Sequence, residues 1–208
     1  MFRKVLIANR GAIACRVIRT LRKMGVASVA VYSQADEHSL HVDQADEAVS
    51  IGPPPAAQSY LSIPALLKAA EDTETEAIHP GYGFLSENAR FAEACAAHGI
   101  VFIGPTPGQM REFGLKHTAR ELAAENGVPM LPGTGVLKDV DAALRAAEDV
   151  GYPTMLKSTA GGGGIGMRLC CSPAELRDLY EAVSRQSQAS FGSGNLYLER
   201  FVTAERHI

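Results

Sequence analysis

Lys157-Ser-Thr-Ala-Gly-Gly-Gly-Gly-Ile-Gly-Met167 is the stretch from which the rest of the chain can be interpreted. Its four consecutive glycines, Gly161–Gly164, are costly, because each glycine in a regular element loses roughly 0.5–1 kcal/mol relative to alanine. In return, a glycine run offers backbone N–H groups with no side chains in the way, which suits close wrapping around a polyphosphate. The stretch therefore indicates a phosphate-binding loop, with a flexible hairpin tip as the alternative.

Two common phosphate motifs do not fit this stretch. A P-loop needs Gly-Lys-Ser/Thr at its end, whereas Gly166 is followed by Met and Arg. Gly161, Gly163 and Gly166 match the spacing G-x-G-x-x-G, but the dinucleotide fingerprint also requires a helix to begin at the loop. Residues 167–171 are instead a short apolar run typical of a strand, and a helix is expected only from about Pro173.

The remaining arrangement is strand, glycine loop, strand. It predicts a flap that lies over phosphates, as in the kinase type of nucleotide site. Lys157, at the end of the incoming strand 154–157, stands where such a flap needs a positive charge.

Composition narrows the class of protein. The chain has 208 residues, of which 46% are hydrophobic and 21% charged, and its formal charge of −3 gives no reason to expect nucleic acid binding. No apolar run approaches the ~20 residues of a membrane span, and the N-terminus lacks the features of a signal peptide. The four cysteines form no C-x-x-C pair, and three of them fall in apolar helix or strand patterns, which predicts small core residues in a reducing, cytoplasmic compartment: Cys15, Cys95, Cys170 and Cys171.

Apolar runs alternate with helical patterns through the first hundred residues. Strands are expected at 4–8, 28–33, 48–51, 77–79 and 100–103, and helices at 13–24, 63–71 and 88–98. This alternation predicts a Rossmann-like parallel sheet with helices on both faces. Ligands bind outside the carboxyl ends of such strands, where the loops Asn9–Gly11 and His79–Asn88 would lie.

The second part of the chain predicts a smaller α+β unit. A helical stretch carries Phe113, Lys116 and Arg120 at spacings of three and four residues. Later segments are expected as a helix at 140–150 capped by Asp139, a strand at 154–157, a helix through 176–183, a loop at 187–195 and a strand at 196–201. We expect domains at 1–112 and 133–208, joined by a helical junction at 113–132. His38 and His41 have no evident third metal ligand, so we expect them on a solvated helix face.

These motifs together resemble the N-terminal half of the biotin carboxylase component of biotin-dependent carboxylases, which are ATP-grasp enzymes. The likeness covers essentially the whole chain and is carried by residues 4–11, 79–88, the glycine flap, 198–201 and Arg206-His207. It implies a pre-ATP-grasp domain of the Rossmann-like type, followed by the small flap domain of an ATP-grasp fold.

The resemblance also implies roles for single residues. Lys116 matches a lysine that contacts the nucleotide, and Lys157 matches the lysine at the α- and β-phosphates. Gly163 and Gly164 match flap residues whose N–H groups approach those phosphates. The adenine and ribose positions are matched by Glu199, Arg200, Phe201, Val202 and His207, with Glu199 at the adenine amino group.

Two details favour one branch of the family. The segment Phe113–Arg120 and the residue Ile165, where most relatives have a flap cation, look like urea carboxylase. A carboxylase acting on an acyl-CoA, pyruvate or guanidine remains the alternative. In another class of function, the alternative is a non-catalytic nucleotide-binding or assembly module.

The resemblance implies that the complete enzyme uses ATP and bicarbonate to make carboxyphosphate and then carboxylates biotin. A carboxyltransferase module would then pass the carboxyl group from the biotin carrier to urea, giving allophanate. The Mg²⁺ ligands, the bicarbonate-binding groups and the catalytic arginine of the family would all follow Ile208. No catalytic residue or metal ligand is therefore expected within the chain, and its oligomeric state stays open.

Overall fold

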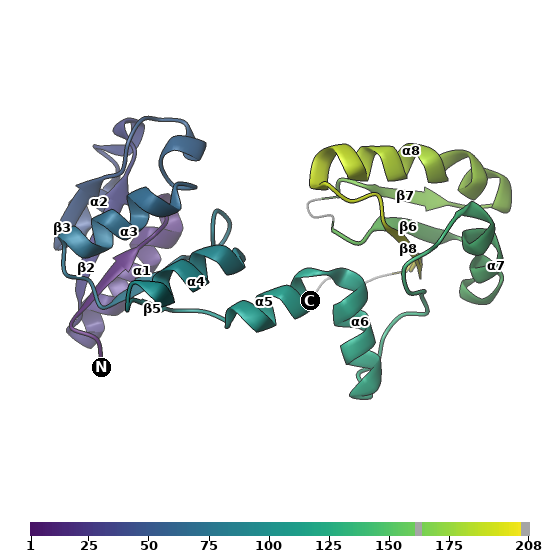
Figure 1. The fold of residues 1–208 in the computed structure, drawn as a ribbon, viewed down its shortest axis with the longest axis horizontal. Helices are drawn as coiled ribbons and strands as arrows, with labels where there is room; N and C mark the ends of the chain where they lie inside the picture. Colours follow the sequence, from purple (N-terminus) through teal and green to yellow (C-terminus); the bar gives the residue numbers. More distant parts are fainter. Residues whose placement is uncertain (161–163, 205–208) are drawn as a thin grey trace. The chain divides into compact units, whose positions relative to one another are not determined.

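The apolar runs of the first half of the chain form five short strands. The structure, a computed structural model, describes residues 1–160 and 164–204 and divides the chain into two compact units, Met1–Arg111 and Glu112–Ile208 (Figure 1). The strands of the first unit are β1 (Lys4–Ile7), β2 (Ala27–Tyr32), β3 (Glu47–Ser50), β4 (Ala77–His79) and β5 (Val101–Phe102). All pair in parallel in the order β3-β2-β1-β4-β5, which confirms the expected sheet.

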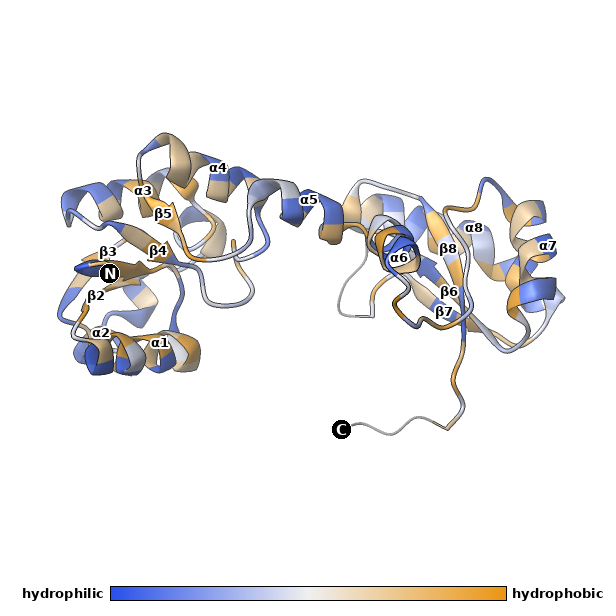
Figure 2. Ribbon diagram, turned by 90° about the horizontal axis from the view of Figure 1, so that it is seen from below, coloured by the Kyte–Doolittle hydropathy of each residue, from blue (hydrophilic) through white to orange (hydrophobic). Residues whose placement is uncertain are grey.

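Helices cover both faces of this sheet, as the alternation predicts. They are α1 (Gly11–Met24), α2 (Leu40–Gln44), α3 (Ile63–Asp72) and α4 (Ala89–Ala97), with 3₁₀ turns η1 (Gln34–Asp36) and η2 (Ala56–Gln58). Successive residues of a strand point to opposite faces. Val5 and Ile7 accordingly belong to the core under α1, whereas Leu6 belongs to the core that contains Leu66 of α3 and Phe91 of α4. In Figure 2, β5 is coloured as hydrophobic, whereas α1 alternates between hydrophobic and hydrophilic residues, as expected of an amphipathic helix.

His41 corrects one expectation. Its side chain is fully buried rather than solvated, and its Nε2 atom lies 3.3 Å from the carbonyl oxygen of Val31 in β2. The short helix α2 packs against β2, which turns His41 inward, whereas Leu40 stays exposed. Cys15, Cys95 and Cys170 are buried and Cys171 is exposed, and all four are free thiols.

The helical stretch expected around Lys116 is two helices, not one. They are α5 (Pro107–Gly114) and α6 (Lys116–Glu125). The break falls at Gly114 and Leu115, where Leu115 has extended backbone angles of φ −100° and ψ 120°. Glycine is a poor helix former, so the chain can turn there at little cost.

The second unit contains a three-stranded antiparallel sheet and two long helices. The elements are β6 (Thr154–Ser158), β7 (Met167–Cys170), β8 (Leu196–Arg200), α7 (Val140–Val150) and α8 (Pro173–Phe191), with strand order β7-β6-β8. Asp139 caps α7 as expected, since its side chain accepts a hydrogen bond from the backbone N–H of Ala142. Leu156, Leu176 and Leu198 are fully buried in the core between the sheet and the two helices.

The loop expected at 187–195 is mostly helix. Residues 187–191 continue α8, which ends at Gly192 in the left-handed conformation with φ +74°. Ser187 is fully buried, so its small side chain serves packing and does not mark a turn. Among the described residues, no helix is both long and apolar enough to cross a bilayer.

Candidate nucleotide site

The two faces of the small sheet have different characters. Leu156 and Leu198 point into the core, so their sequence neighbours Lys157 and Glu199 point to the opposite face. The register pairs Lys157 with Tyr197, which places Glu199 two residues farther along β8 on the same face. Such diagonal neighbours on paired strands are within reach of long side chains. Lys157 and Glu199 form an ion pair between Nζ and Oε2.

Helix α6 adds two cations to this face. Lys116 is its first residue, and its backbone N–H donates to the carbonyl of Thr159 over 3.2 Å, which ties the start of α6 to the end of β6. Arg120 lies one helical turn later, on the same side of the helix. Its Nη1 donates to Oε1 of Glu199 at 2.6 Å, so both oxygens of this carboxylate face a cation.

The electrostatics of this face favour an anionic ligand. Burial, together with the positive charge of Lys157, lowers the pKa of Lys116 below its ordinary value. A lysine at the first position of a helix also opposes the helix dipole. Within the described part of the chain Lys116 has no ion-pair partner. Placing a phosphate between Lys116 and Lys157 would relieve this repulsion.

The described residues of the glycine loop form its root, where the loop leaves β6 and enters β7. The Ser158 N–H donates to the carbonyl of Gly166 at 2.8 Å, which holds the ends of β6 and β7 together. Gly166 has φ +73°, and a Cβ there would lie 2.9 Å from Oγ of Ser187, so a side chain would be strained and crowded. Gly164 is exposed and has φ +84°, with open space around it. Gly163 and His207 lie outside the described residues, so their expected roles stay predictions.

The side chains of Arg200, Phe201 and Val202, which follow Glu199, differ in direction and exposure. Arg200 points to the other side of β8, where its Nε donates to the carbonyl of Val150 at the end of α7. Its side chain therefore supports α7 rather than the face with Glu199. Phe201 is half-buried, and Val202 is 38% exposed. Backbone or wall contacts from Arg200, Phe201 and Val202 to an adenine remain a prediction.

Sequence reasoning did not assign Arg120 or Gly133 to the site. Arg120 Nη2 donates to the carbonyl of Leu131 at 2.8 Å, in addition to its bond with Glu199. A Cβ on Gly133 would lie 2.6 Å from Nη2 of Arg120 and 2.8 Å from the carbonyl oxygen of Leu198. The available signal was the four-residue spacing from Lys116 to Arg120, which places both side chains on one side of a helix.

The two loops expected at the ligand edge of the first unit contact each other. Asn9 is buried, and its Nδ2 donates to the carbonyls of Pro80 and Tyr82, both at 2.8 Å. His79, at the end of β4, accepts a hydrogen bond from the Gly81 N–H, and burial lowers the pKa of its imidazole. Asn9 thus fixes the start of the loop 79–88.

An aromatic pair beside these loops holds a cation. The rings of Tyr60 and Phe84 stack with centroids 5.0 Å apart, and the guanidinium of Arg10 lies 5.3 Å and 5.7 Å from their centroids. Arg10 also pairs with Asp36 at 3.0 Å. Burial acts to raise the pKa of Asp36, but hydrogen bonds from Tyr60, Ser33 and Arg10 outweigh it and leave the pKa below its ordinary value.

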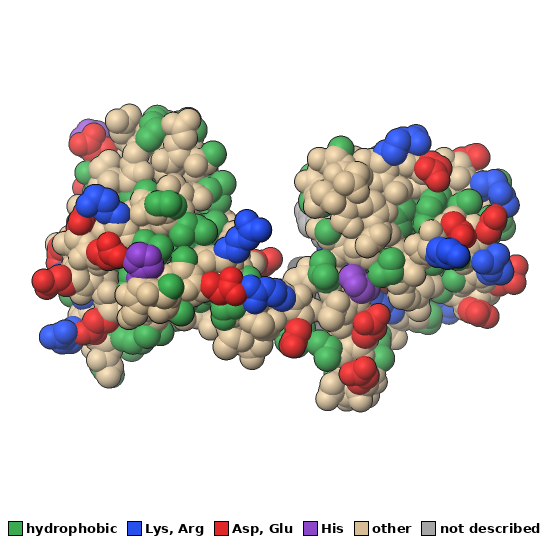
Figure 3. All heavy atoms as spheres, viewed as in Figure 1, with side chains coloured by type: hydrophobic (Ala, Val, Ile, Leu, Met, Phe, Trp, Pro, Cys, Tyr) green, Lys and Arg blue, Asp and Glu red, His purple; other side chains and the backbone are tan. Residues whose placement is uncertain are grey.

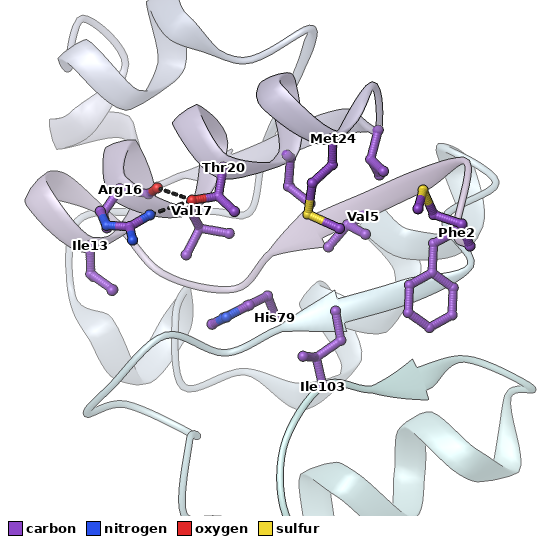
Figure 4. Close-up of a pocket in the computed structure, with 12 residues that line it drawn as sticks. Phe2, Val5, Ile13, Arg16, Val17, Thr20, Met24, His79 and Ile103 are labelled. Atoms are coloured by element: carbon purple, nitrogen blue, oxygen red, sulfur yellow. Dashed lines mark hydrogen bonds between the residues drawn. The ribbon is translucent and has the colours of Figure 1, made fainter.

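A largely apolar cavity of 540 Å³ lies beside α1 in the first unit (Figure 4). Its lining is Met1, Phe2, Val5, Ile13, Arg16, Val17, Thr20, Leu21, Met24, Val26, His79 and Ile103. Arg16 is the only permanently charged side chain in this lining, and Figure 4 shows it bonded to Thr20. We therefore do not assign a polyphosphate to this cavity.

The surface visible in Figure 3 carries acidic and basic side chains intermingled on each unit. Among residues 1–160 and 164–204, no group of three or more His, Cys, Asp or Glu side chains could hold a metal ion.

Comparison with known proteins identifies both units. Residues 1–110 match the family described as biotin carboxylase, N-terminal domain, and residues 116–208 match the ATP binding domain of the carbamoyl-phosphate synthase L chain. The chain is 52% identical to a biotin carboxylase of Nostoc, over 100% of this chain and 46% of that protein. It is 50% identical both to a propionyl-CoA carboxylase alpha chain of Ruegeria pomeroyi and to a urea amidolyase of Lachancea kluyveri, covering 100% of this chain and 31% and 11% of those proteins.

Solved structures agree. The fold matches a biotin carboxylase from Campylobacter jejuni in complex with a β,γ-ATP compound, with a TM-score of 0.94 and 43% identity over 98% of this chain and 46% of that one. It also matches the biotin carboxylase domain dimer of a 2-oxoglutarate carboxylase from Hydrogenobacter thermophilus with MgADP, ADP and bicarbonate, with a TM-score of 0.90 and 45% identity over 98% and 45%. The chain thus spans less than half the length of each of these relatives. With more than half of its residues matching the N-terminal domain and the rest an ATP-binding domain, the chain belongs to the biotin carboxylase family.

Proposed function

We propose that the chain is the ATP-binding N-terminal part of a biotin carboxylase, an ATP-dependent ligase. One observation carries this proposal: at the root of a glycine loop, Lys157 and Arg120 pair with the carboxylate of Glu199, and Lys116 lies near enough to Lys157 to feel its charge. Cations beside bare backbone amides suit the phosphates of a nucleotide. The solved relatives that contain adenine nucleotides support the same reading.

In this proposal, bicarbonate oxygen attacks the γ-phosphorus of ATP, which gives carboxyphosphate and ADP. The carboxyl group then passes to a ring nitrogen of biotin, and inorganic phosphate leaves. Mg²⁺, held by residues beyond Ile208, would neutralise phosphate charge, and biotin would arrive on its carrier module. Phosphoryl transfer depends on positioning and charge neutralisation more than on covalent help from the protein.

Within this chain Lys116 and Lys157 would hold the phosphates, and Glu199 would accept a hydrogen bond from the adenine amino group. Backbone N–H groups of the loop, among them those of Gly163 and Gly164, would close over the triphosphate. We expect the chain alone to bind nucleotide weakly at best, because the proposed metal and bicarbonate ligands follow Ile208. Three buried thiols fit the cytoplasmic location that we propose.

Lys157→Ala in the whole enzyme tests the phosphate role. We expect the KM for ATP to rise about tenfold, the effect of losing roughly 1.4 kcal/mol of charged hydrogen bonding. Lys138→Ala is the matched control, because Lys138 is exposed and lies in the same unit. Unchanged ATP kinetics in Lys157→Ala would contradict the role given to this side chain.

Within the family we propose the urea carboxylase branch, with urea converted to allophanate after transfer by a carboxyltransferase module. The segment Phe113–Arg120 and the residue Ile165 support it. Overall identity does not separate the branches, because the propionyl-CoA and urea relatives are equally similar.

ATP-dependent fixation of labelled bicarbonate by the whole enzyme distinguishes these substrates. Urea, guanidine, propionyl-CoA and pyruvate should be offered in parallel, and we expect turnover with urea. Preference for another acceptor would move the protein to that branch. Absence of bicarbonate-dependent ATP hydrolysis would leave a non-catalytic nucleotide-binding or assembly module.

A further inference from the structure

We propose that Arg120 is a positioning residue of the nucleotide site, which acts as the permanent counter-ion of Glu199 and so frees Lys157 to bind a phosphate. This inference rests on the proposed nucleotide function of the same face. It assigns to Arg120 an effect on the phosphates, although its guanidinium bonds only to Glu199 and to a backbone carbonyl.

The carboxylate of Glu199 is shared between two cations. Oε1 accepts from Nη1 of Arg120 at 2.6 Å, and Oε2 accepts from Nζ of Lys157. The three side chains are only 17–22% exposed. At this degree of burial, a charge that loses its partner is poorly compensated by water.

The two cations are not held equally. Arg120 has a second anchor at the carbonyl of Leu131, and its planar guanidinium can keep both bonds at once. Gly133 leaves space for this arrangement, since any Cβ there would collide with Nη2 of Arg120. The ammonium group of Lys157 bonds only to Glu199 among the described residues, and it is carried on a flexible four-carbon stem. Lys157 is therefore the cation that can move.

This asymmetry determines what a phosphate must displace. With Arg120 in place, Lys157 can turn toward a phosphate while Glu199 keeps one positive partner. Without Arg120, Lys157 would be the only described cation paired with the mostly buried carboxylate of Glu199. Its movement toward a phosphate would then leave that negative charge without a positive partner. A phosphate would then compete with Glu199 for Lys157. The affinity for a ligand would therefore fall most where its phosphates contact Lys157.

The affinity ratio of ATP to adenosine measures this effect, because adenosine lacks the α- and β-phosphates at which the resemblance places Lys157. Both ligands are titrated without Mg²⁺ into the whole enzyme, with dissociation constants taken from equilibrium dialysis. We expect Arg120→Met to lower the ATP preference by roughly tenfold, a typical size for coupling between neighbouring sites. Arg120→Lys should restore most of it, because it returns the charge although it cannot hold both anchors.

Two further variants separate positioning from folding. Arg177→Met removes an arginine that faces Asp141 in the same unit with both side chains more than half exposed, and it should leave the ratio unchanged. In a Glu199→Gln background, Arg120→Met should have no further effect, because no carboxylate charge would then retain Lys157.

An ATP preference unchanged in Arg120→Met would overturn the inference. Equal losses in Arg120→Lys and Arg120→Met would also overturn it, and would leave Arg120 as a clamp on Leu131 that acts on stability. If the wild-type enzyme binds neither adenosine nor ATP, the proposed nucleotide function itself fails. That result differs from a wild-type ATP preference that Arg120 does not affect.

Discussion

At the scale of single residues, Gly133 gives the sharpest stability prediction. A methyl group in Gly133→Ala would meet Nη2 of Arg120 at 2.6 Å and the Leu198 carbonyl at 2.8 Å. We expect a loss of about 1–3 kcal/mol in the free energy of unfolding, the usual cost of overpacking, measured by chemical denaturation. Gly135→Ala is the control, because nothing lies within 4 Å of its Cβ position. Equal stability of the two variants would show that Arg120 moves aside freely.

Single residues also show how far the sequence can predict this site. Lys157 could be assigned because it ends an apolar strand directly before the glycine loop, and Glu199 because it interrupts an apolar strand, which is unusual for a charge. Arg120 could not, because a cation on a helix is ordinarily solvated, and only the tertiary contact of α6 with the small sheet brings it to Glu199. His41 was wrongly expected in solvent, because a five-residue helix has too few positions to define a polar face.

At the scale of elements, the caps of the helices make their own prediction. Oδ1 of Asp139 accepts from the Ala142 N–H at 2.7 Å at the start of α7. Asp139→Ala should lower the free energy of unfolding by about 1 kcal/mol, the usual value of an N-cap. Asp139→Asn keeps an acceptor and should cost much less. Thermal unfolding of the three proteins provides the measurement, and a loss in Asp139→Asn as large as in Asp139→Ala would assign the effect to charge instead of capping.

Element types were predicted better than element lengths. The strands and helices of the first unit have a clear apolar period, and all the expected ones are present. The two errors have local causes. Gly114 divides the junction helix into α5 and α6, and buried Ser187 lets α8 continue through a stretch whose composition is typical of a loop.

At the scale of the whole molecule, the histidines and carboxyl groups with a clearly lowered pKa lie in one of the two units. Burial lowers the pKa of His41 and of His79 below the ordinary 6.5. Among the described carboxyl groups, those with a lowered pKa are Asp36, Asp46 and Glu76. All five groups belong to the unit Met1–Arg111.

This distribution predicts that acid destabilises the first unit first. Below pH 6.5 the unfolded form binds protons that buried His41 and His79 do not, so the free energy of unfolding falls as the pH falls toward their lower folded values. The carboxylates add a further loss only when the pH falls below about 4, through their lowered pKa values. When the pH is lowered from 7.5 to 5.5, hydrogen-exchange protection factors should therefore decrease more in residues 1–111 than in residues 112–204. His41→Gln should reduce this decrease, whereas His38→Gln, which changes an exposed side chain of the same unit, should not. An equal decrease in both units would show that the buried imidazoles do not control the acid response.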